Sequence, residues 1–180
     1  MRLFVGLDFA DRQKNNLEKT RLAFIPHLAG GRIIPTENMH CTLFFMGETD
    51  AARLEEICRA LADTARRHKK FMTGFWDTAH FRNGCAVVKL KTSKAFESLQ
   101  KDVAAAMAPF AAKPDSGDKK YLPHVTLLRD AEFVMPFREV KKHVPVFNFP
   151  FEVTDFTLFE SRRGESGMIY TPITFFNLAQ

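Results

Sequence analysis

The sequence lacks the features that mark several large classes of protein. Its three cysteines are an odd number without a Cys-x-x-Cys pair, which argues against a disulfide framework and against a thiolate zinc site. No apolar run approaches the roughly 20 residues that a membrane-spanning helix needs. Neither type of Gly-rich phosphate-binding loop is present. We therefore expect no disulfide, no structural zinc, no membrane span and no P-loop or dinucleotide-binding motif.

What the chain does contain is typical of one globular unit, or of one unit made of two intimate lobes. A chain of 180 residues buries roughly 70% of its unfolded surface, so that a core can form without a metal or a disulfide. We therefore treat residues 1–180 as a single domain. The first apolar stretch reaches Asp8 and Asp11 too soon for a signal peptide, and we expect a cytoplasmic protein.

A modest excess of basic residues suggests the kind of partner. The 26 Lys and Arg exceed the 21 Asp and Glu, which gives a formal net charge of +5. This balance favours polyanionic partners, nucleic acid above all, although many basic proteins bind none.

Hydrophobic periodicity predicts more strands than helices. The predicted helices are 11–26 (ended by Gly30-Gly31), 50–69 (capped by Asp50) and 93–107. The predicted strands are 2–8, 37–47, 71–81, 85–92, 121–130, 147–161 and 168–178. Strands 71–81 and 85–92 are expected to flank a hairpin turn at Asn83-Gly84. Strands 147–161 and 168–178 are expected to flank a turn at Arg162-Arg163-Gly164. We expect a polar loop at 113–120 and irregular structure at 131–150, with one helical turn near 137–143. Because the strands outnumber the crossover helices, we predict an α+β fold with a mainly antiparallel sheet.

One tetrapeptide pattern, His-x-Thr-Leu, occurs twice. Residues 40–43 (HCTL) and 124–127 (HVTL) each follow an expected loop and begin a β-prone run. On a strand, residues i and i+2 point to the same face, so that the His and the Thr of each copy project together while the other two residues face the core. Two such strands side by side would line a groove with two imidazoles and two hydroxyls.

That set of groups suits the opening of a cyclic phosphate. The reaction needs a base to deprotonate water and an acid to protonate the departing ribose oxygen, and histidine does either near neutral pH. The hydroxyls of Thr42 and Thr126 can donate hydrogen bonds to the phosphate oxygens. A lone strand histidine is more often a structural residue than a catalyst, but two matched copies favour catalysis by His40 and His124. The arrangement requires no metal or other cofactor.

Arg129 is a further candidate ligand of the phosphate or the ribose, because a guanidinium forks onto phosphate oxygens. In a regular strand it shares the face of Leu127, so that a bulge or a strand end is needed to turn it toward the groove. The alternative is a solvated charge at the strand end.

Two longer segments resemble the signatures of the two-histidine phosphoesterase superfamily, and specifically of its bacterial RNA 2',3'-cyclic phosphodiesterases, also called 2'-5' RNA ligases. Residues 32–47 (RIIPTENMHCTLFFMG) are similar to R-x-x-P-x-E-N-hydrophobic-H-x-T-L-x-F-hydrophobic-G. Residues 123–129 (PHVTLLR) are similar to P-H-[VI]-T-L-x-R. Cys41 and Met46 depart from the usual aliphatic residues, as volume-tolerant apolar replacements.

The resemblance implies a bilobal α+β fold with two pseudo-symmetric halves, outer helices and a groove between them that contains both motifs. It implies hydrolysis of a 2',3'-cyclic phosphodiester to a 2'-phosphomonoester without a metal. His40 would then be the proton donor and His124 the acceptor that activates water, Thr42 and Thr126 would bind the phosphate, and Arg129 would match the family's arginine. The residues themselves leave open which histidine is the acid.

Three functional hypotheses follow. The first is an RNA 2',3'-cyclic phosphodiesterase whose partner is an RNA or oligonucleotide end and which acts as a monomer. The second is reversible 2'-5' joining of RNA, in which a ribose hydroxyl replaces water. The third is a binding module that holds RNA ends or nucleotides without turnover.

Overall fold

The computed structural model describes residues 1–112, 121–165 and 167–180, so that the predicted loop 113–120 lies outside the described residues. Its α-helices are α1 (Asp11–Phe24), α2 (Leu54–Arg66), α3 (Lys94–Met107) and the single turn α4 (Phe137–Val140). Its strands are β1 (Arg2–Leu7), β2 (Leu28–Ile33), β3 (Cys41–Glu48), β4 (Phe71–Thr73), β5 (Phe75–His80), β6 (Ala86–Leu90), β7 (His124–Phe133), β8 (Phe151–Val153), β9 (Asp155–Gly164) and β10 (Gly167–Asn177).

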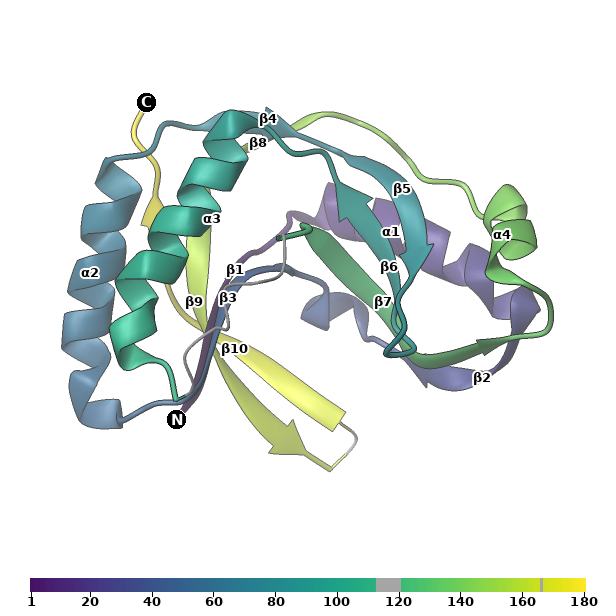
Figure 1. Cartoon of the computed structure of the whole chain (residues 1–180), viewed down its shortest axis with the longest axis horizontal. Helices are drawn as coiled ribbons and strands as arrows, with labels where there is room; N and C mark the ends of the chain where they lie inside the picture. Colours follow the sequence, from purple (N-terminus) through teal and green to yellow (C-terminus); the bar gives the residue numbers. More distant parts are fainter. Residues whose placement is uncertain (113–120, 166) are drawn as a thin grey trace.

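Within the described residues, eight strands form one sheet in the order β10-β9-β1-β3-β7-β6-β5, and β2 pairs with β7 (Figure 1). The strand pairs of this sheet are antiparallel. The remaining strands, β4 and β8, form a separate two-stranded sheet. The predicted α+β fold with a mainly antiparallel sheet is therefore confirmed.

The large sheet has two halves that meet at one place. Strands β1 and β3 pair along most of their length, whereas β3 and β7 pair only through Cys41 and Val125. One half consists of β1, β3, β9 and β10, and the other of β2, β5, β6 and β7. Since Cys41 and Val125 each follow a histidine of the repeated pattern, the two copies of that pattern lie where the halves join.

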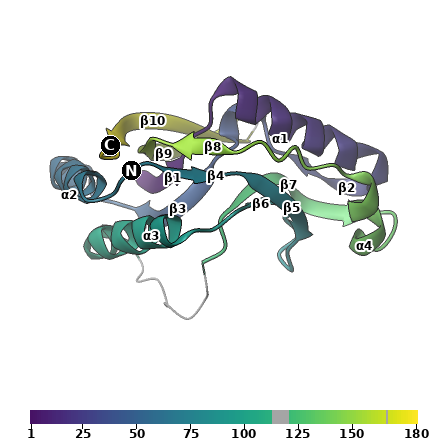
Figure 2. The ribbon, with the colours of Figure 1, turned by 90° about the horizontal axis from the view of Figure 1, so that it is seen from above.

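The helices cover the two halves separately. Helices α2 and α3 pack side by side against the β1–β3 half, and α1 packs against β7 of the other half (Figures 1 and 2). The predicted apolar edge of α3 is fully buried: Phe96, Leu99, Val103 and Met107. The hydroxyl of Ser93 accepts a hydrogen bond from the backbone N–H of Phe96 and so caps this helix. Among the described residues, no helix has both the length and the apolar character needed to cross a membrane.

Several predicted boundaries were wrong for local reasons. Helix α1 ends at Phe24, because Pro26 lacks the N–H that would continue it, and Gly30-Gly31 lies inside β2. The strand predicted at 37–47 begins only at Cys41, after a 3-10 turn at Thr36–Asn38.

The C-terminal hairpin turns later than predicted, and its first strand also starts later. Residues 147–150 form no strand, 151–153 form β8 of the second sheet, and β9 begins only at Asp155. The central hairpin turn was placed correctly. Arg162-Arg163-Gly164 does not form the turn but ends β9, since its pairing with β10 continues to Gly164 and Gly167. The turn predicted at Asn83-Gly84 is confirmed: Gly84 joins β5 to β6 with a φ of 80°, which favours glycine. The helical turn expected near 137–143 is present as α4.

Candidate active site

A cavity of about 200 Å³ lies at the junction of the two halves of the sheet. It is lined by all five residues that the sequence predicted, namely His40, Thr42, His124, Thr126 and Arg129. Ile34, Asn38, Phe81, Asn83, Cys85 and Tyr170 complete its lining. The structure therefore brings together the whole predicted set, from strands that are far apart in the sequence.

The alternation of each pattern fixes how its polar groups face the cavity. Cys41 and Leu43 are buried on β3, and Val125 and Leu127 are buried on β7, each with at most 2% of its surface exposed. Their burial holds the intervening threonines on the opposite face, as predicted. Because Cys41 pairs with Val125, the two strand starts lie side by side and the histidines face one cavity.

Each histidine ring is oriented by a backbone carbonyl two residues before it. The Nδ1 atom of His40 lies 2.8 Å from the carbonyl oxygen of Asn38, and Nδ1 of His124 lies 2.7 Å from that of Leu122. Because a carbonyl oxygen only accepts, Nδ1 carries a proton in both rings. Nε2 is therefore the nitrogen that exchanges protons, and in His40 it lies 3.1 Å from the hydroxyl of Thr42.

His40 sits in an aromatic enclosure. Its ring lies 4.6 Å from the ring of Phe4 and 5.0 Å from that of Tyr170, measured between centroids. Burial lowers the pKa of His40 to about 4, and the bond to Asn38 and the charge of Asp8 oppose this only in part. The ring is therefore neutral at pH 7 in the free protein.

His124 is less enclosed. Its ring meets Phe81 edge-on at a centroid distance of 5.0 Å. Burial also lowers the pKa of His124 below its ordinary value of 6.5, while the bond to Leu122 opposes the shift. The two imidazoles thus start as neutral rings with the same tautomer but with different surroundings.

Arg129 reaches the cavity because β7 is bulged, which is the condition set by its position in the sequence. Thr126 of β7 pairs with Val87 of β6, and Leu128 pairs with Ala86, which is adjacent to Val87 in β6. Leu127 is therefore an extra residue in β7, and the strand has a bulge there. Leu127 and Leu128 are consequently both buried, and Arg129 comes to the face of His124 and Thr126.

A tyrosine connects the two copies of the pattern. The hydroxyl of Tyr121 donates a 2.9 Å hydrogen bond to the backbone carbonyl of Thr42 and lies 3.6 Å from Sγ of Cys41. Tyr121 thus ties the segment before His124 to β3, next to the one strand pair that joins the halves. Burial raises the pKa of the Cys41 thiol to about 11, so that it serves as a packing group and not as a nucleophile.

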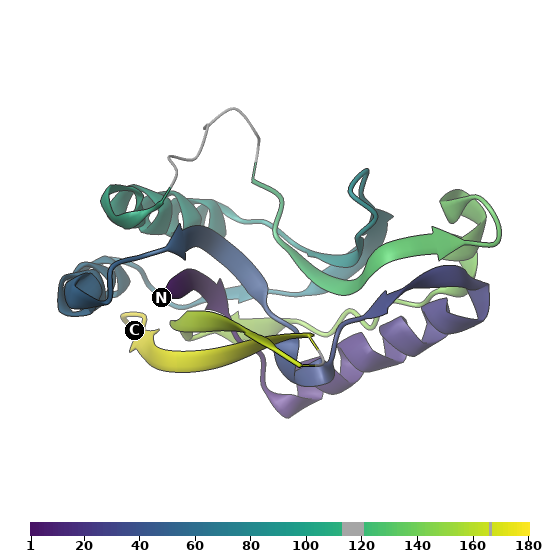
Figure 3. The same cartoon turned by 90° about the horizontal axis from the view of Figure 1, so that it is seen from below.

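Sequence reasoning missed two residues that shape the site. Asn38 is buried, and its Nδ2 donates a 2.6 Å hydrogen bond to the carbonyl of Met168. This bond attaches the start of β10 to the segment before β3, and the two segments lie side by side in Figure 3. The place of Asn38 inside the first motif was a signal for it. Tyr170, which faces His40 from β10, had none, because it lies 130 residues away in an ordinary strand pattern.

The donor set is suited to phosphate and not to a metal. Two imidazoles, two hydroxyls and a guanidinium converge on one cavity. Within residues 1–112, 121–165 and 167–180, no three His, Cys, Asp or Glu side chains gather as metal ligands would. Such a set can hold an anion and move protons on both sides of it.

Comparisons with known proteins agree with this geometry. A family model described as the 2'-5' RNA ligase superfamily matches residues 11–165. The RNA 2',3'-cyclic phosphodiesterase of Escherichia coli K12 is 30% identical over 181 residues, which cover 99% of this chain and 97% of that protein.

Solved structures show the same fold. TT0787 of Thermus thermophilus superposes with a TM-score of 0.82 at 24% identity, and E. coli LigT in complex with 3'-AMP with a TM-score of 0.78 at 28% identity. Both alignments cover 99% of this chain and 98% of the other. On its motifs, its fold and the match over most of its length, the chain belongs to the 2'-5' RNA ligase superfamily of two-histidine phosphoesterases.

Proposed function

We propose that this enzyme hydrolyses the 2',3'-cyclic phosphodiester at an RNA or oligonucleotide end to a 2'-phosphomonoester. The observation that supports it most strongly is the pair of His-x-Thr patterns in one cavity, each with a proton on Nδ1 and with Nε2 left to act. The relatives named RNA 2',3'-cyclic phosphodiesterase support the same reaction.

In the proposed mechanism the cyclic phosphate lies between the two rings. Nε2 of His124 takes a proton from water as its oxygen forms a bond to phosphorus. Nε2–H of His40 gives a proton to the 3'-oxygen as the bond between phosphorus and that oxygen breaks. The product carries the phosphate on the 2'-oxygen, and each ring ends in the protonation state opposite to its starting state, so that proton exchange with solvent completes the cycle.

The donor role of His40, which follows the family resemblance, requires this ring to be charged when substrate is bound. Burial and the positive charge of Arg129 both lower its pKa in the free protein. A bound phosphate anion offsets both, because it neutralises the guanidinium and favours an adjacent imidazolium. We therefore infer that substrate binding itself raises the pKa of His40 and supplies the acid form.

The remaining three residues bind the phosphate in this mechanism. Thr42 and Thr126 donate hydrogen bonds to its non-bridging oxygens, where negative charge grows in the transition state. Arg129 pairs with the same charge from the β7 bulge. The hydroxyl of Thr42 exchanges its contact with Nε2 of His40 for the phosphate.

We further propose that the chain acts as a single-domain monomer. The two halves are interleaved in sequence, since β3 of one half is preceded by β2 and followed by β5 of the other. The three cysteines are unpaired, which suits a reducing compartment such as the cytoplasm. Size-exclusion chromatography with light scattering measures the molar mass and so tests whether the protein is a monomer.

The decisive experiment is turnover of a 2',3'-cyclic phosphate dinucleotide in EDTA by the native protein, His40→Ala and His124→Ala. We expect a 2'-phosphate product from the native protein and almost none from either variant. Product that disappears in EDTA contradicts the metal-free mechanism. Binding by all three proteins without any product identifies a binding module, and a 2'-5' linked product with an added RNA acceptor identifies ligation.

A further inference from the structure

The active-site cavity opens into two further hollows along β10. The second hollow shares four lining residues with the cavity: Ile34, Asn38, Arg129 and Tyr170. The third shares three with the second: Arg32, Gly167 and Met168. Since each neighbouring pair shares residues, the three hollows lie in a row along β10, and we call this row the β10 groove. It runs from the histidines to the end of the β9–β10 hairpin, which extends from the body of the molecule (Figures 1 and 3).

Strand register fixes which side chains face this groove. In the hairpin, Tyr170 pairs with Ser161 and Met168 pairs with Arg163, and paired residues point to the same face of a sheet. Arg163 therefore lies on the face of Tyr170, displaced by two residues, or about 7 Å, along the strands. Because Tyr170 contacts His40, the guanidinium lies on the groove side, farther from the reacting centre.

The middle of the β10 groove has apolar side chains beside the charged Arg32, Glu37 and Arg129. Ile33 lines it from β2, with 51% of its surface exposed, and Met168 and Tyr170 line it from one face of β10. These three side chains offer flat and apolar contacts to a nucleobase, and proteins bind single-stranded RNA mainly through such contacts.

The far end of the β10 groove is basic. Arg2, Arg32 and Arg163 line it, with Glu48 as the one acidic side chain among its described lining residues. Arg32 pairs with Asp130, whereas in the described part of the chain Arg2 and Arg163 have no carboxylate within 4.0 Å. The guanidinium of Arg2 lies over the ring of Phe45 at 5.1 Å, which leaves its N–H edge available.

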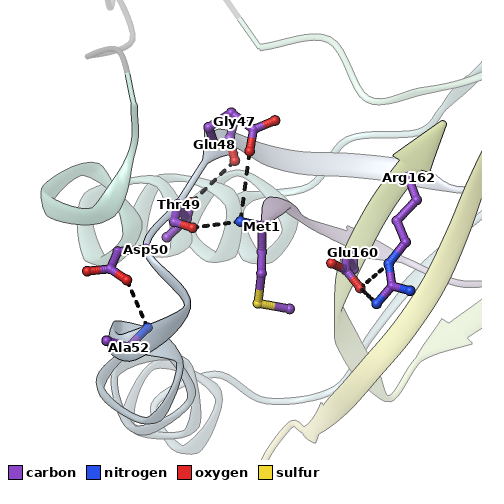
Figure 4. A network of polar contacts seen from close by, with 8 residues as sticks. All are labelled: Met1, Gly47, Glu48, Thr49, Asp50, Ala52, Glu160 and Arg162. Carbon is purple, nitrogen blue, oxygen red and sulfur yellow. Dashed lines mark hydrogen bonds and ion pairs between the residues drawn. The ribbon is translucent and has the colours of Figure 1, made fainter.

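The carboxylates near this end already face cations. Glu48 lies 3.8 Å from the N-terminal ammonium of Met1 (Figure 4). Glu160 accepts a hydrogen bond of 2.8 Å from Nε of Arg162 (Figure 4). Strand alternation places both residues on the face opposite Arg163. The charge of Arg2 and Arg163 is thus left for a ligand.

We propose that Arg2 and Arg163, with the paired Arg32 beside them, form a binding site for the backbone phosphates of the RNA strand that leads to the cyclic end. The inference rests on the proposed function for the position of the cyclic phosphate at the histidines. The terminal nucleoside then lies against the apolar side chains in the middle of the β10 groove, and the preceding phosphates reach the arginines. The site makes an oligonucleotide a better substrate than a free cyclic mononucleotide, because only the oligonucleotide extends to it.

The test compares the native protein with Arg2→Gln/Arg163→Gln. Turnover is measured on a tetranucleotide ending in a 2',3'-cyclic phosphate and on a 2',3'-cyclic mononucleotide. We expect the ratio of the two kcat/KM values to fall about tenfold in the variant, since each lost phosphate contact weakens only the longer substrate. Binding of a fluorescent tetranucleotide with a 3'-phosphate is followed by anisotropy between 50 and 300 mM salt. The slope of log Kd against log salt should become less steep by about 1.4, or about 0.7 for each contact to a single strand.

The matched control is Arg59→Gln/Arg66→Gln, which removes the same charge from the exposed side of α2. It should leave both the ratio and the salt slope at their native values. If both double variants have equal effects, only net charge matters and the proposed site is wrong. The proposed site is also wrong if Arg2→Gln/Arg163→Gln keeps the native ratio of kcat/KM values and the native salt slope.

The two proposals fail separately. If no cyclic phosphate is turned over but binding depends on the two arginines, the proposed hydrolysis is wrong and the phosphate site stands. If the mononucleotide is hydrolysed while the tetranucleotide is neither preferred nor bound through the arginines, the hydrolysis stands and the phosphate site is wrong.

Discussion

The two copies of the His-x-Thr pattern have the same local geometry but different neighbours. In both, a carbonyl two residues earlier orients the ring through Nδ1, and a buried apolar pair holds the strand. His40, however, is enclosed by Phe4 and Tyr170, whereas His124 meets only Phe81 among the described aromatic rings. The pattern thus sets the position of each ring, and the packing around it sets its proton affinity.

This difference bears on the proposed division of labour between acid and base. A repeated tetrapeptide cannot by itself make two rings act differently. The differing partners come from β1 and β10 on one side and from the β5–β6 hairpin on the other. The asymmetry that the proposed mechanism needs therefore lies in the halves of the sheet and not in the motifs.

Removal of either imidazole tests whether the two sides are equally necessary. We expect His40→Ala and His124→Ala each to lower kcat/KM on a cyclic dinucleotide by about 100- to 10,000-fold, because each loses one proton-transfer step. The double variant should be little worse than either one, since the two rings act as a unit. Steady-state kinetics in EDTA measures all three, and losses that multiply in the double variant contradict a concerted pair.

Acid stability separates the two environments without reference to activity. The pKa of His40 is about 4 in the folded protein and about 6.5 in the unfolded chain, so that the unfolded state binds the proton more readily. Between pH 7.5 and pH 4, His40 should therefore lower the free energy of unfolding by about 3 kcal/mol. His40→Gln should therefore lose less stability on acidification than the native protein, by this amount. The corresponding difference between the native protein and His124→Gln should be smaller. Urea denaturation at both pH values gives the differences, and equal acid losses in native protein and His40→Gln contradict the buried neutral ring.

A glycine on β1 sharpens the contrast, because it lies close to the β3 backbone next to His40. A Cβ atom on Gly6 would lie 3.0 Å from the carbonyl oxygen of Cys41, which is tight, and 3.5 Å from Cδ2 of His40, which is an ordinary contact. We expect Gly6→Ala to push the backbone of Cys41 away, to shift the adjacent His40 with it and to lower kcat about tenfold, since catalysis is sensitive to small displacements. Gly30→Ala is the control, because its Cβ would meet only Oε2 of Glu132 at 3.7 Å. Equal rates for the two variants would show that His40 tolerates the added methyl group.

The pH profile should report the smallest effect, a displaced optimum. Because burial lowers the pKa of both histidines, the free enzyme holds a single shared proton only at acidic pH. We expect kcat/KM to peak between about pH 4 and pH 6.5, and kcat to peak at higher pH, because the bound phosphate raises both pKa values. Profiles of the two parameters on one substrate test this. A kcat/KM maximum above pH 7 contradicts the lowered pKa values.

The motif residues could be predicted from the sequence because their constraint is local. In each motif the Thr lies two positions after the His, which places both on one strand face, and the structure confirms this for residues 40–43 and 124–127. The alternation of β-prone segments likewise predicted the antiparallel sheet. Arg129 could be placed only conditionally, since a bulge depends on how β7 pairs with β6 and not on β7 alone.

The surroundings of the motifs were not predictable, because they depend on tertiary packing. Nothing near Tyr170 signals that β10 lies beside His40, and the bond from Asn38 to Met168 joins segments 130 residues apart. The C-terminal turn was misplaced because Arg162-Arg163-Gly164 has the polar composition of a turn, whereas cross-strand pairing continues through it.

The single Cys41–Val125 pair between β3 and β7 also has a mechanical meaning. If the two halves of the sheet rotate against each other, a one-pair junction is the natural pivot, and displacement is smallest on the axis of a rotation. The histidines next to this pair would then keep their spacing while the distant ends of the groove, at β2 and the β9–β10 hairpin, widen or narrow.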